Sequence, residues 1–143
     1  MYIYFLVIGG ITIIGLIFAF INMKKQKNRI QDFLSENPTA GKVHLKSSYG
    51  VTQEVTTVYT VNNESPYLFT KGTKSGFYAP VGNNIISVSY SYTRPGVMYR
   101  SVTKSTDVIE LEIEIEENKE YELSFDKKAE TFVFEEKENK QKK

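Results

Sequence analysis

The chain's one histidine and its carboxylates are the residues best suited to acid–base chemistry. His44 is the single histidine among 143 residues, and there is no cysteine. A catalytic triad or a histidine-based metal site would therefore need carboxylates or hydroxyls to complete it. His44 stands between Val43 and Leu45, so strand alternation turns it away from these apolar neighbours. We interpret it as an exposed strand histidine and expect no catalytic residue, no metal site and no cofactor.

A row of four glutamates is the strongest charge pattern. Neighbouring carboxylates in such a row lie about 6.6–7 Å apart along a strand, too far to chelate one ion, and the loop pattern of a calcium site is absent. A glycosidase would need two carboxyls in a cleft, which an open sheet face does not offer. Solubility and cross-strand pairing with Lys or Arg explain the row; docking of a basic partner is the alternative. Its members are Glu110, Glu112, Glu114 and Glu116.

A second pattern places basic residues among tyrosines. Arg94 and Arg100 flank this stretch, with Lys104 nearby, and the tyrosines are Tyr90, Tyr92 and Tyr99. Such a mixture can stack on bases or sugars, but Tyr90 and Tyr92 share the core-facing phase of their strand, which favours core packing. The formal net charge of only +1 excludes a globally basic nucleic-acid binder. Arg94 and Arg100 remain candidates for binding a protein partner.

The N-terminal residues 1–23 contain none of the charged side chains. Residues 2–21 are an apolar run of the length that crosses about 30 Å of hydrocarbon as a helix. A cleaved signal peptide is the alternative, but no Lys or Arg precedes the run and no A-x-A-like site follows it. We therefore expect an uncleaved transmembrane helix. Gly15 and Ala19 form a small-xxx-small pair that could admit a second membrane helix.

A basic cluster directly after this run indicates the orientation. It consists of Lys24, Lys25, Lys27 and Arg29. The positive-inside rule places this side, and the domain that follows, in the cytoplasm; the same cluster could contact anionic lipid headgroups. Residues 24–40 are expected to form a basic juxtamembrane helix and linker, with the helix stopped at Asn37-Pro38 because the residue before a proline is displaced from the α region.

Residues 41–135 show the period-two alternation of strands with turn signals every 8–12 residues. The clearest strand alternates isoleucine and leucine with the glutamate row. One-face burial in each strand predicts an all-β fold, an immunoglobulin-like antiparallel β-sandwich of seven or eight strands; a small β-barrel is the alternative. Segment 71–76 is expected to be a loop, and residues 117–119 a hairpin turn. Residues 136–143 are expected to be a disordered charged tail.

The segment 76–88 resembles an element of small bacterial membrane-tethered β-sandwich modules of the PEGA type. There a strand ends in a Pro-x-Gly turn, here Pro80-Val81-Gly82, and the next strand begins with an x-x-I-x-V alternation, here Asn84 to Val88. The later Glu120-Tyr121-Glu122-Leu123 is similar to the matching penultimate strand. The name-giving Pro-Glu-Gly-Ala sequence is absent. The resemblance implies an accessory or interaction module without catalytic residues.

Together these patterns predict a single-pass membrane protein with a non-enzymatic accessory domain in a membrane-associated assembly. The expected partners are the membrane and a protein, or a second copy bound through the transmembrane helix or a sheet edge; nucleic acid is not expected. An extracellular ligand- or carbohydrate-binding domain is the alternative and would require the opposite orientation. An enzyme is a third reading that would need two carboxylates brought together by folding.

Overall fold

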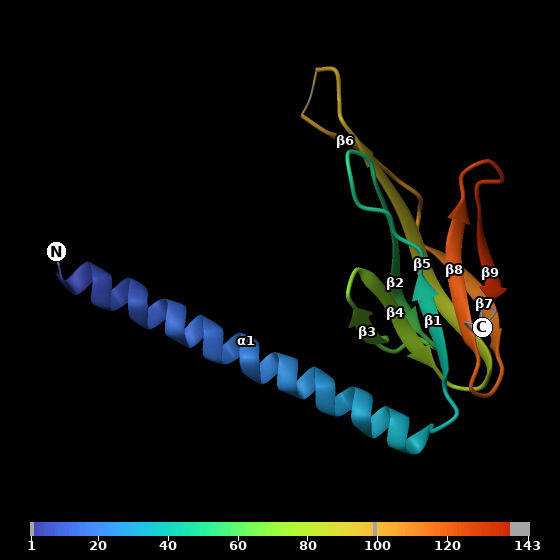
Figure 1. Ribbon diagram of the computed structural model, residues 1–143, viewed down its shortest axis with the longest axis horizontal. Coiled ribbons are helices and arrows are strands. Elements are labelled where there is room, and N and C mark those ends of the chain that lie inside the picture. Colours follow the sequence, from blue (N-terminus) through green and yellow to red (C-terminus); the bar gives the residue numbers. More distant parts are fainter. Residues whose placement is uncertain (1, 99, 138–143) are drawn as a thin grey trace, which may run out of the picture. The chain divides into compact units, whose positions relative to one another are not determined.

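The computed structural model describes residues 2–98 and 100–137 (Figure 1). The chain divides into a helical unit that ends at Glu36 and a β unit that begins at Asn37. The helical unit is α1 (Tyr2–Glu36), a single helix. From Val7 onward it is long and apolar enough to cross a membrane, and a signal sequence would meet the same criterion. It ends directly before Asn37-Pro38, where the proline restricts the backbone of the preceding residue.

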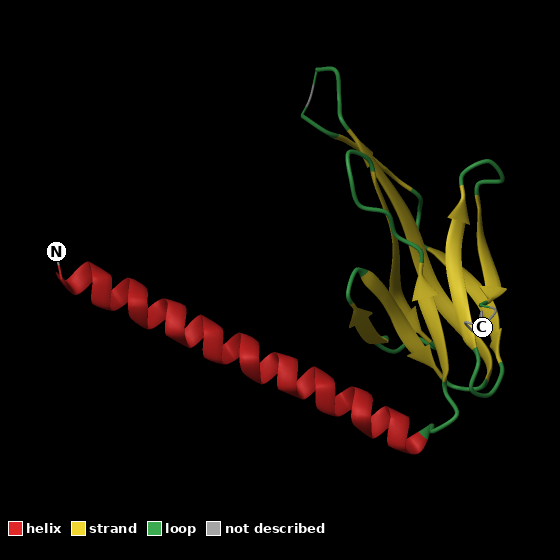
Figure 2. Ribbon diagram, viewed as in Figure 1, coloured by secondary structure: helices red, strands yellow, loops and turns green. Residues whose placement is uncertain are grey.

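The β unit contains two sheets (Figure 2). The five-stranded sheet has the order β3 (Tyr67–Lys71), β4 (Lys74–Ala79), β1 (Gly41–Leu45), β8 (Glu120–Asp126), β9 (Thr131–Glu136). The four-stranded sheet is built on β5 (Gly82–Arg94). One side of β5 pairs with β2 (Gln53–Val61), and its other side pairs first with β7 (Ile109–Ile115) and then with β6 (Val102–Ser105).

The inward faces of both sheets share one apolar core. Val43 of β1, Phe77 of β4, Ile86 of β5 and Leu123 of β8 are completely buried within it. Each belongs to the apolar phase of an alternating strand, because successive side chains of a strand point to opposite faces. Tyr121 is also buried there and stacks on Phe134 of β9, with ring centroids 4.8 Å apart.

The strand count and one pairing differ from expectation. The described residues form nine strands rather than seven or eight. Strands β1 and β8 pair in parallel, so the sheets are not purely antiparallel. This pairing is possible because the long chain between the two strands crosses to the other sheet and returns. Strand β1 lies between β4 and β8, whereas the immunoglobulin constant-type order places the first strand at an edge.

Several turns also differ from expectation. Segment 71–76 is not a loop: β3 and β4 form a tight hairpin around Gly72 and Thr73, and the positive φ of Gly72 permits it. The turn after β7 is not a hairpin, since β7 and β8 belong to different sheets. Strand β9 includes Glu136, the first residue of the expected tail, and residues 138–143 lie outside the described part.

The pairing directions assign each turn to one end of the β unit. The linker end carries residues 37–40, 62–66, 80–81 and 116–119. Here Asn118 donates a backbone hydrogen bond of 3.0 Å to Thr39, and Lys42 donates one of 3.1 Å to Lys119. The opposite end, which we call the distal end, carries residues 46–52, 72–73, 95–98 and 127–130 (Figure 1). The β unit therefore displays these four segments at the end away from its junction with the linker.

Candidate functional site

The side chains singled out on the helix are exposed. Lys24, Lys25 and Lys27 are exposed on α1, beyond its most apolar part, and Arg29 follows them on the same helix. Ala19 is exposed, and a Cβ atom added to Gly15 would meet nothing within 4 Å. In the single chain, the small-residue face is therefore open, and a helix of another molecule could approach it closely.

The glutamate row divides into two parts. Glu110, Glu112 and Glu114 are exposed on β7, on the face opposite the buried Ile113 and Ile115. Among the described residues these three carboxylates form no ion pair, so the expected cross-strand pairing with lysine or arginine is absent there. They line an outer strand of the four-stranded sheet, since β7 pairs only with β5 in the described structure.

The fourth glutamate has a partner beyond the strand. Glu116 lies 2.8 Å from the ammonium group of Lys119, which also donates a 2.8 Å hydrogen bond to Glu136 of β9. These two carboxylates raise the pKa of Lys119 above its ordinary value. Lys119 therefore links Glu116, in the same turn, to Glu136 on the last strand of the other sheet.

The expected basic and aromatic cluster does not form as one surface. Arg94 and Arg100 are exposed near the distal end. Tyr90, however, is buried and stacks on Phe125, with ring centroids 4.4 Å apart. Tyr92 packs against the core, and the ammonium of Lys127 lies 5.1 Å from its ring centroid. Tyr99 lies outside the described residues. Core packing is thus the use of Tyr90 and Tyr92, as expected from their strand phase.

Large apolar side chains are exposed at the distal end. Val97 and Met98, between Arg94 and Arg100, are almost entirely exposed, and Tyr49 and Val51 of the segment between β1 and β2 are also exposed. Gln53 pairs with Thr93, so both segments leave the same end of the β2–β5 pair. The sequence singled out Arg94 and Arg100 in this region, whereas Tyr49, Val51 and Met98 belong to no motif that would have marked them.

The interpretation of His44 as an exposed residue is wrong. Its side chain is only 15% exposed, although it does point away from the core as alternation requires. Its Nε2 lies 3.1 Å from a carboxylate oxygen of Glu120 on β8. Its ring meets Phe69 of β3 edge to face, with centroids 5.4 Å apart. Strand β4 lies between β1 and β3, and its residue at this level is Gly76, whose missing side chain leaves room for the contact.

Charge around His44 is balanced by Glu120. Lys42 lies 3.8 Å from the second oxygen of this carboxylate. Partial burial opposes ionisation of Glu120, but the hydrogen bond with His44 and the charges of His44 and Lys42 outweigh it and lower its pKa. Glu120 thus pairs with two cationic or hydrogen-bonding side chains of β1, Lys42 and His44.

A second ion pair lies between the sheets at the distal end. Lys127 donates a 2.5 Å hydrogen bond to Glu54 of β2. This bond lowers the pKa of Glu54 and raises that of Lys127. Burial of the Tyr90 hydroxyl, together with the nearby charge of Glu54, raises the pKa of Tyr90. The pair therefore holds the turn after β8 against the start of β2.

The described residues contain no group of three or more His, Cys, Asp or Glu side chains placed to hold a metal ion. The carboxylates named above either stand apart along β7 or pair with cations. The arrangement offers three surfaces for binding: the exposed apolar and basic distal end, the acidic strand β7, and the half-buried His44 with its neighbours Glu120 and Phe69. No family model, curated protein or solved structure matches this chain.

Proposed function

We propose that this protein is a membrane-anchored, non-enzymatic interaction module that binds a protein partner through its distal end. The observation that carries the proposal is the nearly complete exposure of Val97 and Met98 between two arginines, on the end opposite the linker. Contiguous exposed apolar patches rimmed by polar residues mark interaction sites, and here the apolar pair lies between two arginines in the sequence. Methionine and arginine are both enriched in protein interfaces.

The distal end also suggests the partner's chemistry. Arg94 and Arg100 stand on either side of the apolar pair, and guanidinium groups pair well with carboxylates in two-point geometry. The partner surface would therefore combine an apolar pocket with a carboxylate rim. Such charge complementarity contributes specificity and association rate.

The proposed setting is the cell membrane, with α1 as a single uncleaved span and the β unit in the cytoplasm. The apolar helix supports the span, and the lysines that follow its apolar part support the orientation through the positive-inside rule. The two-sheet architecture supports a β-sandwich of the immunoglobulin-like class, while the central place of β1 departs from the usual order. Kinship with PEGA-type modules is likewise a proposal, resting on the Pro80–Gly82 turn.

Site-specific crosslinking tests the interaction. A photoreactive amino acid would replace Met98 in the full chain, expressed in intact cells; the control position is Val81, an exposed apolar residue at the linker end. We expect a discrete protein adduct from position 98 that is absent from position 81 and is lost when Val97→Ser removes the neighbouring anchor. Absence of an adduct at 98, or the same adducts from both positions, would reject the distal end as the binding surface.

Cysteine labelling tests the orientation. Ser75, which the sequence placed in a loop, lies within β4, whereas Thr73 is exposed in the β3–β4 turn. Since the chain has no native cysteine, Thr73→Cys gives a single reporter. Protection from a membrane-impermeant maleimide in intact cells, with labelling after lysis, is the expected result. Labelling of intact cells would place the β unit outside.

An extracellular carbohydrate-binding module is the second candidate. The observation that favours it is a pair of half-buried aromatic rings on the outer face of the five-stranded sheet, Phe69 and Tyr78, with centroids 5.0 Å apart. Aromatic faces of this kind can stack on sugar rings. This candidate requires that the same Thr73→Cys reporter be labelled in intact cells.

A further inference from the structure

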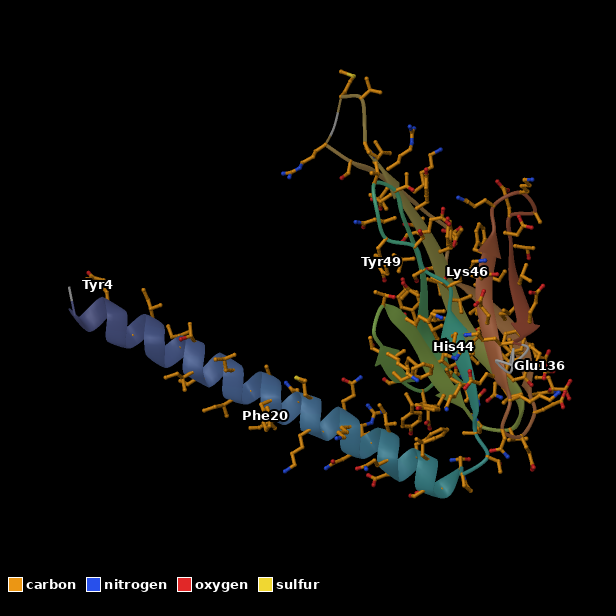
Figure 3. The ribbon with its side chains drawn as sticks, viewed as in Figure 1. Tyr4, Phe20, His44, Lys46, Tyr49 and Glu136 are labelled. Carbon is orange, nitrogen blue, oxygen red and sulfur yellow. The ribbon has the colours of Figure 1, made fainter. Side chains whose placement is uncertain are left out.

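A cavity of about 390 Å³ opens on the five-stranded sheet toward the distal end. Its walls come from four separate segments: β1 and the residues after it, the β3–β4 turn, β8, and the residue that follows β9. Figure 3 shows His44 on β1, and Lys46 and Tyr49 in the segment that follows β1. Val97 and Met98 do not line this cavity, whereas Tyr49, one of the exposed residues of the distal end, does.

Positive charge predominates in the cavity. Three lysines line it, Lys46, Lys74 and Lys137, against one carboxylate, Glu122. Lys46 lies 3.9 Å from Glu122, so that carboxylate is already engaged. Within the described part of the chain, Lys74 forms no ion pair, whereas the charge of Lys137 is one of those that lower the pKa of Glu120. Three ammonium groups gathered from three elements leave the cavity with an excess of positive charge that an anion would neutralise.

Unpaired polar atoms occur in the same place. His44 Nδ1 and Ser47 Oγ are buried without a hydrogen-bond partner in the described structure, and both residues line the cavity. Buried polar atoms are nearly always paired in folded proteins, so each exception calls for an explanation. The hydroxyls of Ser48, Tyr49 and Thr73 add further donors along the walls. The cavity therefore combines excess cations with unused hydrogen-bonding capacity.

We propose that this cavity binds the phosphate group of a phosphorylated ligand through Lys46, Lys74 and Lys137. Lysine binds phosphate as a point charge. Several lysines together match the double negative charge of a phosphate group better than they match the single charge of a carboxylate ligand. The volume exceeds that of one phosphate, which leaves room for the group to which the phosphate is attached. A divalent cation is disfavoured here because the charged walls are mainly ammonium groups.

Titration with inorganic phosphate tests the proposal on the full chain. The protein is held in maltoside micelles, which contain no phosphate, at constant ionic strength set with chloride. We expect saturable shifts of the amide resonances of residues 46–49 and 73–74. Lys74→Gln and Lys137→Gln should each weaken binding roughly tenfold, the equivalent of about 1.4 kcal/mol. The matched control is Lys104→Gln, an exposed lysine on β6 of the other sheet, which should bind as the unmodified chain does.

Two results would overturn the proposal. One is a shift that grows linearly without saturating and that added chloride reproduces. The other is equal weakening by Lys104→Gln and Lys74→Gln, which would show a general charge effect. Where saturable binding is found, two further probes identify the source of the phosphate. Glucose 6-phosphate should reproduce the shifts if the ligand is soluble, and phosphatidylglycerol nanodiscs should do so, relative to phosphatidylcholine, if it is a lipid headgroup.

Discussion

The ring of His44 meets the ring of Phe69 edge to face across an intervening strand, with centroids 5.4 Å apart. The residue between them is Gly76, paired with His44 on one side and with Phe69 on the other. A Cβ atom built on Gly76 would lie 2.5 Å from the Phe69 ring and closer still to the carbonyl oxygen of Val43. The contact between the two rings therefore depends on the absence of a side chain at position 76.

Gly76→Ala should destabilise the β unit. The added methyl group cannot be accommodated without moving backbone, and overpacking of this kind costs about 1–3 kcal/mol. Urea unfolding measures the loss. Gly50→Ala is the control, because the nearest atom to its added Cβ is 3.8 Å away. An unchanged midpoint for Gly76→Ala would contradict the tight contact described here.

Asn84→Ala should also lower the free energy of unfolding. Asn84 is buried; its amide donates 2.9 Å hydrogen bonds to the carbonyls of Pro80 and Gly82, and its oxygen accepts one of 2.8 Å from Asn62. Leaving these groups without a partner costs about 1–3 kcal/mol. The neighbouring Asn83 is exposed, so Asn83→Ala should unfold at nearly the same urea concentration as the original chain. Equal effects of the two substitutions would refute this role for Asn84.

Stability should fall at acidic pH, in part through Glu120. Its folded pKa lies below the ordinary value of 4.5, so its contribution is present above about pH 4.5 and is lost as the pH falls through the lower, folded value. Glu120→Gln should therefore reduce the pH dependence of the free energy of unfolding between pH 6 and pH 3. Glu112, which forms no ion pair among the described residues, supplies the control Glu112→Gln. A slope unchanged by Glu120→Gln would show that its interaction with His44 does not contribute.

The apolar helix should keep the full chain in the membrane. If α1 is an uncleaved span, the protein remains in membranes washed with alkaline carbonate, and its intact mass corresponds to the entire sequence. A signal sequence would instead leave a shorter, soluble chain. The measurement distinguishes the two outcomes because the residues from Asn37 onward form a compact unit separate from the helix.

Much of the local structure follows from the sequence. The alternation of isoleucine and glutamate predicted the strand β7 and its inward face; Ile113 and Ile115 are buried as expected, whereas Ile109 at the start of the strand is 43% exposed. The end of α1 before Asn37-Pro38 agrees with the restriction that proline imposes. These features depend on neighbours one to four residues away, which the sequence displays directly.

Tertiary structure decided which strands became neighbours and which side chains met. Nothing in residues 116–119 distinguishes a hairpin from a crossing between sheets, because the choice depends on which distant strands bury their apolar faces together. The sequence correctly predicted that His44 points away from the core. Its partial burial, however, comes from Phe69 and Glu120, which are both distant in the sequence. The lysines of the cavity, Lys46, Lys74 and Lys137, are likewise brought together by strand pairing. Periodicity determines the face of a strand, whereas pairing over long separations determines what that face contacts.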